Sequence, residues 1–244
     1  AKAAVLLVDT FNATFERENA HAAARVLGAA GYRVHALGRR GTPYCCGRTC
    51  LSLGMVASAK AKARELIGAL EQFARRGIAI VGLEPSCLLT LRDEALAMNL
   101  GESASLVASQ AFLFEEFIAR EKRAGRFALE LRPAGRPILL HGHCHQKAFA
   151  AVSPILEVLS LIPEAKPRLI ESSCCGMAGS FGYEAEHYGI SMQMAELSLL
   201  PAVRAAPDAI VVADGISCRE QIAHGAERRA VHAARLLDQL AIYG

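Results

Sequence analysis

The sequence predicts an α/β protein built from two pseudo-symmetric βαβ-type halves with parallel sheets. Short apolar runs of strand length alternate with longer segments of helical periodicity. A Cys-Cys-Gly turn occurs once in each half, and the cysteines follow predicted strands. Because strands that alternate with helices form βαβ units, each half is expected to carry its own parallel sheet, with the cysteines on loops at the carboxyl ends of the strands.

The elements of the first half follow from the spacing of its apolar residues. Short apolar runs predict strands at residues 5–8, 33–37 and 78–83. Helices are predicted at residues 18–30 and 55–76, and the glycines that follow them, Gly31 and Gly77, suit helix C-caps. A further amphipathic helix is predicted at residues 102–123, between the halves.

The second half repeats this order. Strands are predicted at residues 138–141, 168–170 and 209–213, with helices between them. The Pro- and Gly-rich residues 133–137 are the best candidate for a linker. We therefore expect two domains: residues 1–133, a degenerate first repeat with its connecting helix, and residues 134–244, a more complete second repeat.

Matched spacings indicate an internal duplication. Cys45 and Cys174 are 129 positions apart, as are Cys46 and Cys175, whereas Cys87 and Cys218 are 131 apart. The runs AVLLVDTFN and PILLHGHCH align at an offset of 133, which places Phe11 opposite Cys144. One cysteine position of the second half is thus a phenylalanine in the first.

Composition excludes several classes of protein. With 244 residues, 52% hydrophobic, and a net charge of +3, the chain is expected to be globular and not to bind nucleic acid. Its apolar runs are shorter than the roughly 18 to 20 residues of a transmembrane helix. The start at Ala1 fits either a domain cut from a longer chain or loss of the initiator Met. Without a leader we expect a cytoplasmic protein, either free or peripheral at the inner membrane, where clustered cysteines bind metal or carry out redox chemistry.

The cysteines of the second half are expected to meet at one point. Loops that leave the carboxyl ends of parallel strands gather at one edge of the sheet, where ligands bind. Four cysteines follow the three predicted strands there: Cys144, Cys174, Cys175 and Cys218. The first half offers Cys45, Cys46 and Cys87 in equivalent places, and Cys50 is expected to be a small buried hydrophobe.

Adjacent cysteines suit a metal cluster better than a disulfide, because one peptide bond holds their Cα atoms closer than a relaxed disulfide prefers. Thiolates that bind iron also need nearby groups that offset their charge. The backbone N–H groups that begin the helices after Cys144 and Cys218, together with Lys147 and Arg219, are candidates. Gly47 and Gly176 fit either a close approach of the backbone to a cluster or an ordinary tight turn.

These motifs resemble a known family. The segments that carry the resemblance are VDTFNATFERENA, CCGRT, GLEPSCLLTLRDE, HGHCHQKA, SCCGMAGSFGYE and ADGISCREQI. They are similar to the cysteine-rich CCG domain found in heterodisulfide reductase, in the iron–sulfur subunit of glycolate oxidase and in the anaerobic glycerol-3-phosphate dehydrogenase. They most resemble the C-terminal module of fused dehydrogenases that carry an FAD-linked oxidase domain and a ferredoxin-like domain and act on D-2-hydroxy acids such as D-lactate or D-2-hydroxyglutarate.

The resemblance implies a 4Fe–4S cluster on Cys144, Cys174, Cys175 and Cys218, with FAD on a separate domain and a further electron acceptor. The fullest family members have five cysteines in each half, and Gly215 stands where one of them would be. In the first half Phe11 and Glu84 replace two ligands. The remaining Cys45, Cys46 and Cys87, with Glu84 beside them, are a second candidate site that can hold zinc with an outside fourth ligand or can be empty.

The histidines near Cys144 have several open roles. His141, His143 and His145 alternate in sequence, so they share one face only if the strand continues that far. Each is a candidate to ligate metal, donate to a thiolate or contact a substrate, and at least one is expected to be an ordinary strand-end or helix-cap residue. His143 and His145 are assigned, with Lys147 and Arg219, to the surroundings of the metal site.

Three functions remain open at this stage. The leading interpretation is an iron–sulfur electron-transfer module of a flavin-linked dehydrogenase, in which this chain performs no substrate chemistry itself. The second is a structural or partner-binding module held together by zinc on the same four thiolates. The third is a thiol–disulfide redox protein in which an exposed cysteine of low pKa, such as Cys45 or Cys87, attacks an electrophile.

Overall fold

The computed structural model describes residues 2–39 and 41–243. It divides into two compact units, Ala1–Leu129 (unit 1) and Glu130–Gly244 (unit 2). Ala1, Arg40 and Gly244 lie outside the described residues. The domain boundary that the sequence suggests between residues 133 and 134 stays a prediction.

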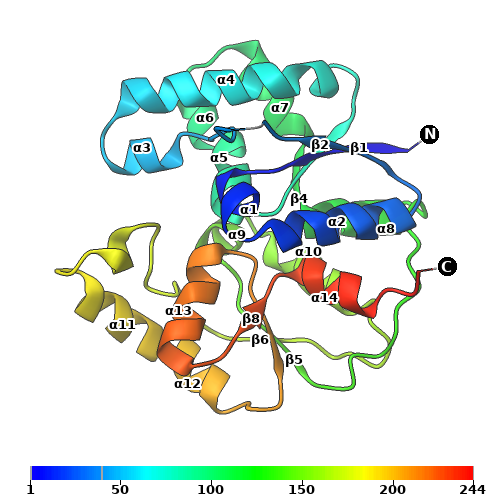
Figure 1. Ribbon diagram of the computed structural model, residues 1–244, viewed down its shortest axis with the longest axis vertical. Coiled ribbons are helices and arrows are strands. Elements are labelled where there is room, and N and C mark those ends of the chain that lie inside the picture. Colours follow the sequence, from blue (N-terminus) through cyan, green and yellow to red (C-terminus); the bar gives the residue numbers. More distant parts are fainter. Residues whose placement is uncertain (1, 40, 244) are drawn as a thin grey trace. The chain divides into compact units, whose positions relative to one another are not determined.

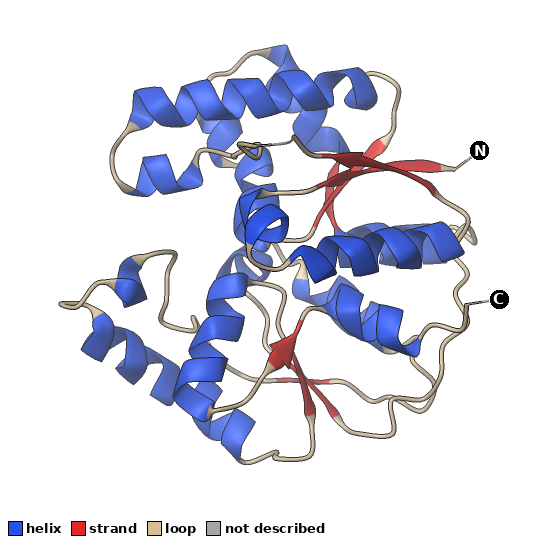
Figure 2. Cartoon of the chain, viewed as in Figure 1, coloured by secondary structure: helices blue, strands red, loops and turns tan. Residues whose placement is uncertain are grey.

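Unit 1 contains a four-stranded sheet of order β2-β1-β3-β4 in which each neighbouring pair is parallel (Figures 1 and 2). Its strands are β1 (Ala3–Leu7), β2 (Arg33–Leu37), β3 (Ala79–Gly82) and β4 (Ala111–Leu113). Its helices are α1 (Thr10–Thr14), α2 (Arg17–Ala29), α3 (Arg48–Ser52), α4 (Val56–Ala74), α5 (Pro85–Arg92), α6 (Glu94–Ala97), α7 (Glu102–Gln110) and α8 (Phe114–Arg123).

Unit 2 repeats this topology with strand order β6-β5-β7-β8, again parallel throughout. Its strands are β5 (Ile138–Leu140), β6 (Arg168–Leu169), β7 (Ile210–Val212) and β8 (Ala230–Val231). Its helices are α9 (Cys144–Ala148), α10 (Val152–Leu159), the 3-10 turn η1 (Phe181–Tyr183), α11 (Tyr188–Glu196), α12 (Leu199–Arg204), α13 (Ile216–Ala226) and α14 (Ala233–Leu240). The predicted fold class, two pseudo-symmetric α/β halves with parallel sheets, is therefore confirmed.

Burial explains why the central strands read as continuous apolar runs. The strands β1 and β3 have buried side chains on both faces, as is usual where helices cover both sides of a parallel sheet. Figure 1 shows α4 on one side of the unit 1 sheet and α2 with α8 on the other. The helix α4 buries the stripe Ala59, Ala63, Leu66, Ile67 and Leu70, which repeats at three- and four-residue intervals.

Two elements differ from the sequence-based expectation. The single helix predicted at residues 102–123 is wrong, because Ala111–Leu113 forms β4, which pairs with β3 and separates α7 from α8. A short apolar segment is compatible with both a helix and a strand, and only pairing to β3 decides between them. The two-residue strand β8, which pairs with β7, was also not predicted.

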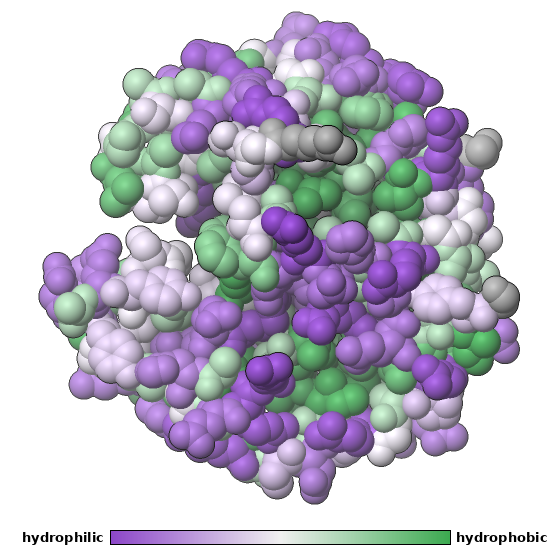
Figure 3. Space-filling view, viewed as in Figure 1, coloured by the Kyte–Doolittle hydropathy of each residue, from purple (hydrophilic) through white to green (hydrophobic). Residues whose placement is uncertain are grey.

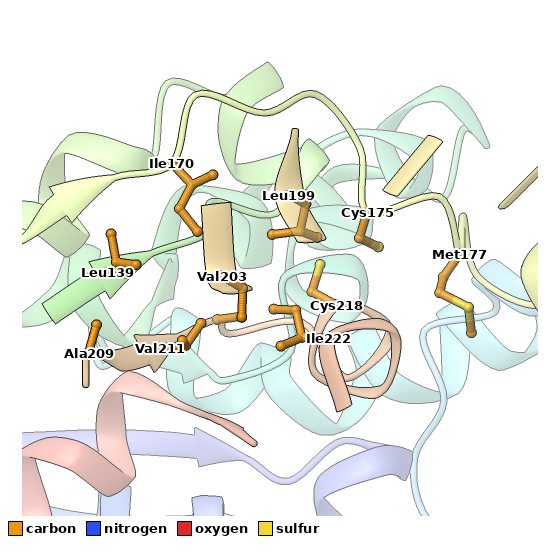
Figure 4. Packing of buried hydrophobic residues seen from close by; sticks show 11 residues of the cluster. Leu139, Ile170, Cys175, Met177, Leu199, Val203, Ala209, Val211, Cys218 and Ile222 are labelled. Atoms are coloured by element: carbon orange, nitrogen blue, oxygen red, sulfur yellow. The ribbon is translucent and has the colours of Figure 1, made fainter. Parts of the chain in front are cut away.

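The hydrophobic core of unit 2 includes two of its cysteines. Leu139 of β5 and Val211 of β7 pack with Leu199 and Val203 of α12 and with Ile222 of α13. Cys175 and Cys218 belong to the same buried cluster and lie near each other, on the side of the cluster toward Met177 (Figure 4). The packing that holds α13 against the sheet therefore also fixes the position of the Cys218 thiol.

The helices of the described chain are too short or too polar to span a membrane. Among residues 2–39 and 41–243, no helix is both long enough and apolar enough to cross a bilayer. Hydrophilic residues are spread over the face seen in Figure 3, with apolar residues in small separate groups.

Candidate metal centre

The four predicted ligands of unit 2 come from three loops at the carboxyl ends of neighbouring strands. Cys144 begins α9 after β5, the pair Cys174 and Cys175 follows β6, and Cys218 lies in the first turn of α13 after β7. In the strand order β6-β5-β7, one connection places β6 on one side of β5 and the next places β7 on the other side. This reversal is a topological switch point, and parallel sheets bind ligands at the carboxyl ends of the strands there.

Hydrogen bonds join the four thiols into one continuous group. Cys144 contacts Cys174, Cys174 contacts Cys175, and Cys175 contacts Cys218. Cys175 and Cys218 are buried, with 4% and 1% of their surfaces exposed, whereas Cys144 and Cys174 are half-buried. The structure thus brings together the four side chains that the sequence singles out, while their role as ligands stays a prediction.

The thiols alternate between proton donors and acceptors along this group. Contact with Cys174, reinforced by burial, raises the pKa of Cys144, and contacts with Cys174 and Cys218 raise the pKa of Cys175. The pKa of Cys174 is lowered well below its usual value, because it accepts hydrogen bonds from Cys144 and Cys175. Contact with Cys175 likewise lowers the pKa of Cys218, to which the imidazoles of His141 and His143 add. These shifts favour the thiolate form, which binds metal, at Cys174 and Cys218.

The repeated Cys-Cys-Gly turn has a conformational cause that both units share. Gly47 and Gly176 have φ values of +88° and +94°, in the left-handed region that side chains disfavour. Each glycine N–H donates to the sulfur of the first cysteine, Gly47 to Cys45 at 3.4 Å and Gly176 to Cys174 at 3.3 Å. The turn thus supplies a backbone donor to the sulfur in each half.

His143 and His145 belong to the start of α9 and not to a continued strand. The strand β5 ends at Leu140, and the Nδ1 atom of His143 accepts a hydrogen bond from the His145 N–H at 3.1 Å as the helix N-cap. The His143 ring stacks on His145 with centroids 5.1 Å apart, and its Nδ1 lies 3.8 Å from the Cys144 sulfur. The expectation that at least one of the three histidines is a helix-cap residue is confirmed for His143.

His141 lies apart from the other two histidines, on the buried side of the thiols. Its ring nitrogen and the sulfurs of Cys175 and Cys218 all lie within 4.8 Å of one another. From the sequence, His141 was one of three histidines that could ligate metal, donate to a thiolate or contact a substrate. Only His143 and His145 were assigned to the surroundings of the metal site. The signal available in the sequence was its position as the first residue after a buried strand that leads to a cysteine.

Lys147 holds the loop that carries the cysteine pair. Its ammonium group donates to the backbone carbonyls of Ser172 and, at 2.6 Å, of Ser173. Burial lowers the Lys147 pKa, while the charges of the four thiols act in the opposite direction. Arg219 is also buried and donates to the Ala213 carbonyl at 2.7 Å, at the end of β7. Both residues thus brace loops that carry the cysteines.

A buried polar network, not foreseen from the sequence, connects two of these loops. Gln146 accepts from the His143 N–H at 2.9 Å and donates to Asp214 at 2.9 Å, and Asp214 accepts from the Ala233 N–H at 3.1 Å. Asp214 and Gln146 are almost completely buried. The spacing of His143 and Gln146 matches a capping box, which is the sequence signal that could have revealed this network.

Gly215, expected from the sequence to replace a cysteine of the family pattern, has a steric role. A Cβ atom there would lie 2.4 Å from Cδ2 of His143. The His143 ring therefore occupies the space into which a side chain at residue 215 would extend.

The three cysteines of unit 1 form a smaller group with a different electrostatic character. Contact with Cys46 and burial raise the pKa of Cys45. Contact with Cys46 lowers the pKa of Cys87, but burial and the nearby carboxylates of Asp9 and Glu84 raise it to about 11 overall. Raised pKa values are the opposite of what thiol chemistry at Cys45 or Cys87 requires.

Glu84, predicted as a neighbour of this site, is the N-cap of α5. Its carboxylate accepts from the Ser86 hydroxyl at 2.7 Å and from the Ser86 N–H at 3.3 Å. Within the described part of unit 1, no three Cys, His, Asp or Glu side chains bring their ligand atoms within 4.8 Å of one another. Metal binding by Cys45, Cys46, Cys87 and Glu84 stays a prediction.

The fold and the site define a duplicated α/β protein with a cysteine group at the carboxyl end of each parallel sheet. The comparison with known families agrees with this duplication, since one family matches twice, at residues 9–92 and 138–223. The chain belongs to the family of the CCG cysteine-rich domain.

Relatives of this chain include parts of two kinds of dehydrogenase. It is 27% identical over 216 residues to one subunit of the anaerobic glycerol-3-phosphate dehydrogenase of Escherichia coli, with 88% of this chain and 53% of the relative covered. It is 31% identical over 162 residues to D-2-hydroxyglutarate dehydrogenase of Escherichia coli, with 63% of this chain and 14% of the relative covered. The D-2-hydroxyglutarate dehydrogenase of Pseudomonas putida is 27% identical over 248 residues, with 97% and 22% covered. The chain thus spans about half, or less, of the relatives it matches.

Proposed function

We propose that this chain is the electron-transfer part of a larger flavin-linked oxidoreductase, with a 4Fe–4S cluster held by Cys144, Cys174, Cys175 and Cys218. The observation that carries the proposal is the single hydrogen-bonded group that these four thiols form, with thiols from three loops at the β5–β7 switch point. Such a cluster, when bound, supplies a one-electron redox centre.

The protein groups around the thiols fit a negatively charged metal centre. The Gly176 N–H already donates to the Cys174 sulfur, and the charge of Lys147 acts on all four thiols. N–H donors and a cation stabilise thiolates in the partly buried setting that this site provides. In unit 1 the negative charges of Asp9 and Glu84 act on the Cys87 thiol, so unit 2 is the better-suited half.

The larger enzyme is proposed to oxidise a D-2-hydroxy acid such as D-lactate or D-2-hydroxyglutarate. Its FAD-binding oxidase domain and a ferredoxin-like domain would then lie outside this chain, with a separate electron acceptor. Support comes from the D-2-hydroxyglutarate dehydrogenases, although the relative from glycerol-3-phosphate dehydrogenase gives equal support to a different substrate. The enzyme is proposed to be cytoplasmic, either free or peripheral at the inner membrane.

A zinc-stabilised module is the second candidate. The ligand atoms of His141, Cys175 and Cys218 lie within 4.8 Å of one another, a compact set that suits a single ion. Zinc at this site would tie the three loops together without redox chemistry.

Anaerobic purification separates the two candidates. Iron, acid-labile sulfide and zinc are measured, and the reduced protein is studied by electron paramagnetic resonance (EPR), for the wild type and for Cys174→Ser. The cluster proposal expects iron and sulfide with an EPR signal that Cys174→Ser abolishes, while the matched control Cys50→Ser retains it. Stoichiometric zinc without sulfide would overturn it.

The substrate is tested on the complete dehydrogenase. Anaerobic addition of D-lactate or D-2-hydroxyglutarate is expected to produce the reduced EPR signal, whereas glycerol 3-phosphate is not. Reduction by glycerol 3-phosphate alone would overturn the D-2-hydroxy acid proposal and leave the electron-transfer role standing.

A further inference from the structure

One nitrogen of His141 is buried without a hydrogen bond of ordinary geometry. The side chain has 0% of its surface exposed, and its Nε2 atom makes no such bond within the described residues, although the His141 ring interacts with the Cys218 thiol. Buried polar atoms in proteins are nearly always satisfied, so an exception of this kind needs a physical account. An ion is one such account, because a ring nitrogen of His141 and the sulfurs of Cys175 and Cys218 lie within 4.8 Å of one another.

The hydrogen bonds around the opposite ring nitrogen favour one tautomer of His141. The Nδ1 atom of His141 lies 2.9 Å from the Ser172 hydroxyl oxygen. That hydroxyl donates a hydrogen bond to the Ile170 carbonyl at 3.4 Å and accepts one from the Lys147 ammonium group at 3.4 Å. Because the Ser172 proton is directed to Ile170, its oxygen accepts the proton on Nδ1. Nε2 is then left with a free lone pair, the form in which imidazole binds metals.

The spacing of the three side chains suits coordination to one ion. A tetrahedral ion with metal–sulfur bonds of about 2.3 Å and metal–nitrogen bonds of about 2.0 Å holds its ligand atoms about 3.6 Å apart. A ring nitrogen of His141 and the two sulfurs already lie within 4.8 Å of one another. Cys175 and Cys218 are as deeply buried as His141, so this is the enclosed end of the cysteine group.

We propose that, when unit 2 holds a single ion such as Zn²⁺, a ring nitrogen of His141, assigned as Nε2, is a ligand of that ion beside the Cys175 and Cys218 thiolates. The inference rests on the zinc-binding alternative under the proposed function and adds to it a mixed nitrogen–sulfur ligand set. The Ser172 hydroxyl positions the ring, and Lys147 holds both the Ser172 carbonyl and its hydroxyl.

Cobalt binding to the metal-free, reduced full chain tests this assignment. Co²⁺ is titrated into the wild type, His141→Gln, Cys174→Ser and the control His224→Gln, which alters an exposed histidine of unit 2. Loss of a ligand changes the d–d bands of Co²⁺, whereas sulfur-to-cobalt charge-transfer bands report the thiolates. We expect His141→Gln to shift the d–d bands and weaken Co²⁺ binding about tenfold or more, with His224→Gln unchanged.

The outcomes separate this inference from the proposed function. If His141→Gln binds Co²⁺ with the wild-type spectrum and affinity while Cys174→Ser weakens the charge-transfer bands, the histidine assignment is wrong and the thiolate site stands. If the wild type shows no charge-transfer bands, the histidine assignment and the single-ion site are both wrong, and the cluster proposal is decided by the iron, sulfide and EPR measurements.

A measurement on the wild type covers the case in which His141→Gln does not fold. Protein labelled with ¹⁵N-histidine is loaded with Zn²⁺, and two-bond ¹H–¹⁵N correlations are recorded for the imidazole rings. A metal-bound Nε2 with a protonated Nδ1 on one buried histidine supports the assignment, and Ser172→Ala is expected to alter that same ring. Spectra in which every imidazole is unchanged by Zn²⁺ would overturn it.

Discussion

Gly176 lies against the backbone of α11, so close that a Cβ atom on it would come 2.1 Å from the Ser191 carbonyl oxygen. Gly47 has the same relationship to α4 in unit 1, where a Cβ atom would lie 2.6 Å from the Ala59 carbonyl oxygen. The glycine that follows each cysteine pair is therefore required by helix packing as well as by its positive φ. The sequence suggested either a close approach of the backbone to a cluster or an ordinary tight turn, and the structure shows a left-handed turn that packs against a helix.

Gly176→Ala is expected to lower the free energy of unfolding by about 3 kcal/mol, since it combines left-handed strain with overpacking against a backbone atom. Urea unfolding monitored by circular dichroism measures the effect. Gly189→Ala is the control, because nothing lies within 4 Å of the added methyl group and alanine favours the helix α11. A loss in Gly176→Ala no larger than in Gly189→Ala would contradict the packing explanation.

The fold was predictable because its strongest signals are local. The strand predicted at residues 33–37 and the helices α2 and α4 lie where apolar spacing and C-terminal glycines placed them. The strand β4 was missed because its three residues, Ala111–Leu113, carry no periodicity of their own and gain strand structure only through pairing with β3. Such pairing is a long-range property that a short window of sequence does not contain.

The composition of the cysteine group was predictable for a topological reason. Once Cys144, Cys174 and Cys218 are known to follow neighbouring parallel strands, the sheet brings their loops together. The orphaned nitrogen of His141 and the contact of His143 with Gly215 were not predictable, because each depends on ring orientation. Orientation follows from hydrogen bonds to Ser172 and to the His145 N–H, which no spacing rule specifies.

Lys147→Met is expected to weaken Zn²⁺ binding to the metal-free chain about tenfold, because it releases the Ser172 and Ser173 carbonyls and removes a positive charge near all four thiols. Competition with a chromophoric chelator under anaerobic conditions gives the affinity. Lys166→Met, an exposed lysine of the same unit, is the matched control. Equal affinities for the two variants would show that Lys147 does not support the site.

Gly215→Cys is expected to destabilise the chain by about 2 kcal/mol, because the new side chain meets the His143 ring. In the His143→Ala background the same substitution should cost at least about 1 kcal/mol less, since the ring is gone. A double-mutant cycle of urea unfolding measures the coupling. Additive effects would mean that the two positions do not compete for the same space.

The thiols of the two units are expected to differ in their pH response. The pKa of Cys174 is lowered by hydrogen bonds from Cys144 and Cys175, so Cys174 is already a thiolate between pH 6 and 8 and its alkylation rate should be nearly constant there. The pKa of Cys45 is raised by contact with Cys46 and by burial, so its rate should increase about tenfold per pH unit.

Iodoacetamide labelling of the reduced, metal-free chain, followed by peptide mass spectrometry, measures both alkylation rates. Zn²⁺ should protect Cys174. A rate for Cys174 that rises as steeply as that of Cys45 would contradict the thiolate assignment.

An ion-pair network in unit 1 predicts a pH-dependent part of the stability. The Glu121 carboxylate, with a 6% exposed side chain, accepts two hydrogen bonds from Arg126, both at 2.7 Å, and one from the Tyr32 hydroxyl at 2.8 Å. The hydrogen bonds from Arg126, and after them that from Tyr32, outweigh burial and lower the Glu121 pKa to about 2. Because the pKa is lowered on folding, the ionised carboxylate stabilises the fold above the unfolded pKa of about 4.5, and this contribution is lost as the pH falls toward 2.

Glu121→Gln is therefore expected to lower the free energy of unfolding at pH 7 by about 2 kcal/mol. This is less than the whole shift of the Glu121 pKa would give, because Arg126 is half exposed and solvent screens the ion pair. The difference from the wild type should be constant from pH 7 to about 5 and should narrow below about 4.5. Urea unfolding at several pH values measures it. Glu71→Gln, which removes an i,i+4 ion pair with the exposed Arg75 and a hydrogen bond from the Ser103 hydroxyl, is the control and should cost clearly less than Glu121→Gln. If the free energy of unfolding of Glu121→Gln differs from that of the wild type by the same amount at every pH down to the acid transition, the charge of the Glu121 carboxylate does not stabilise the fold.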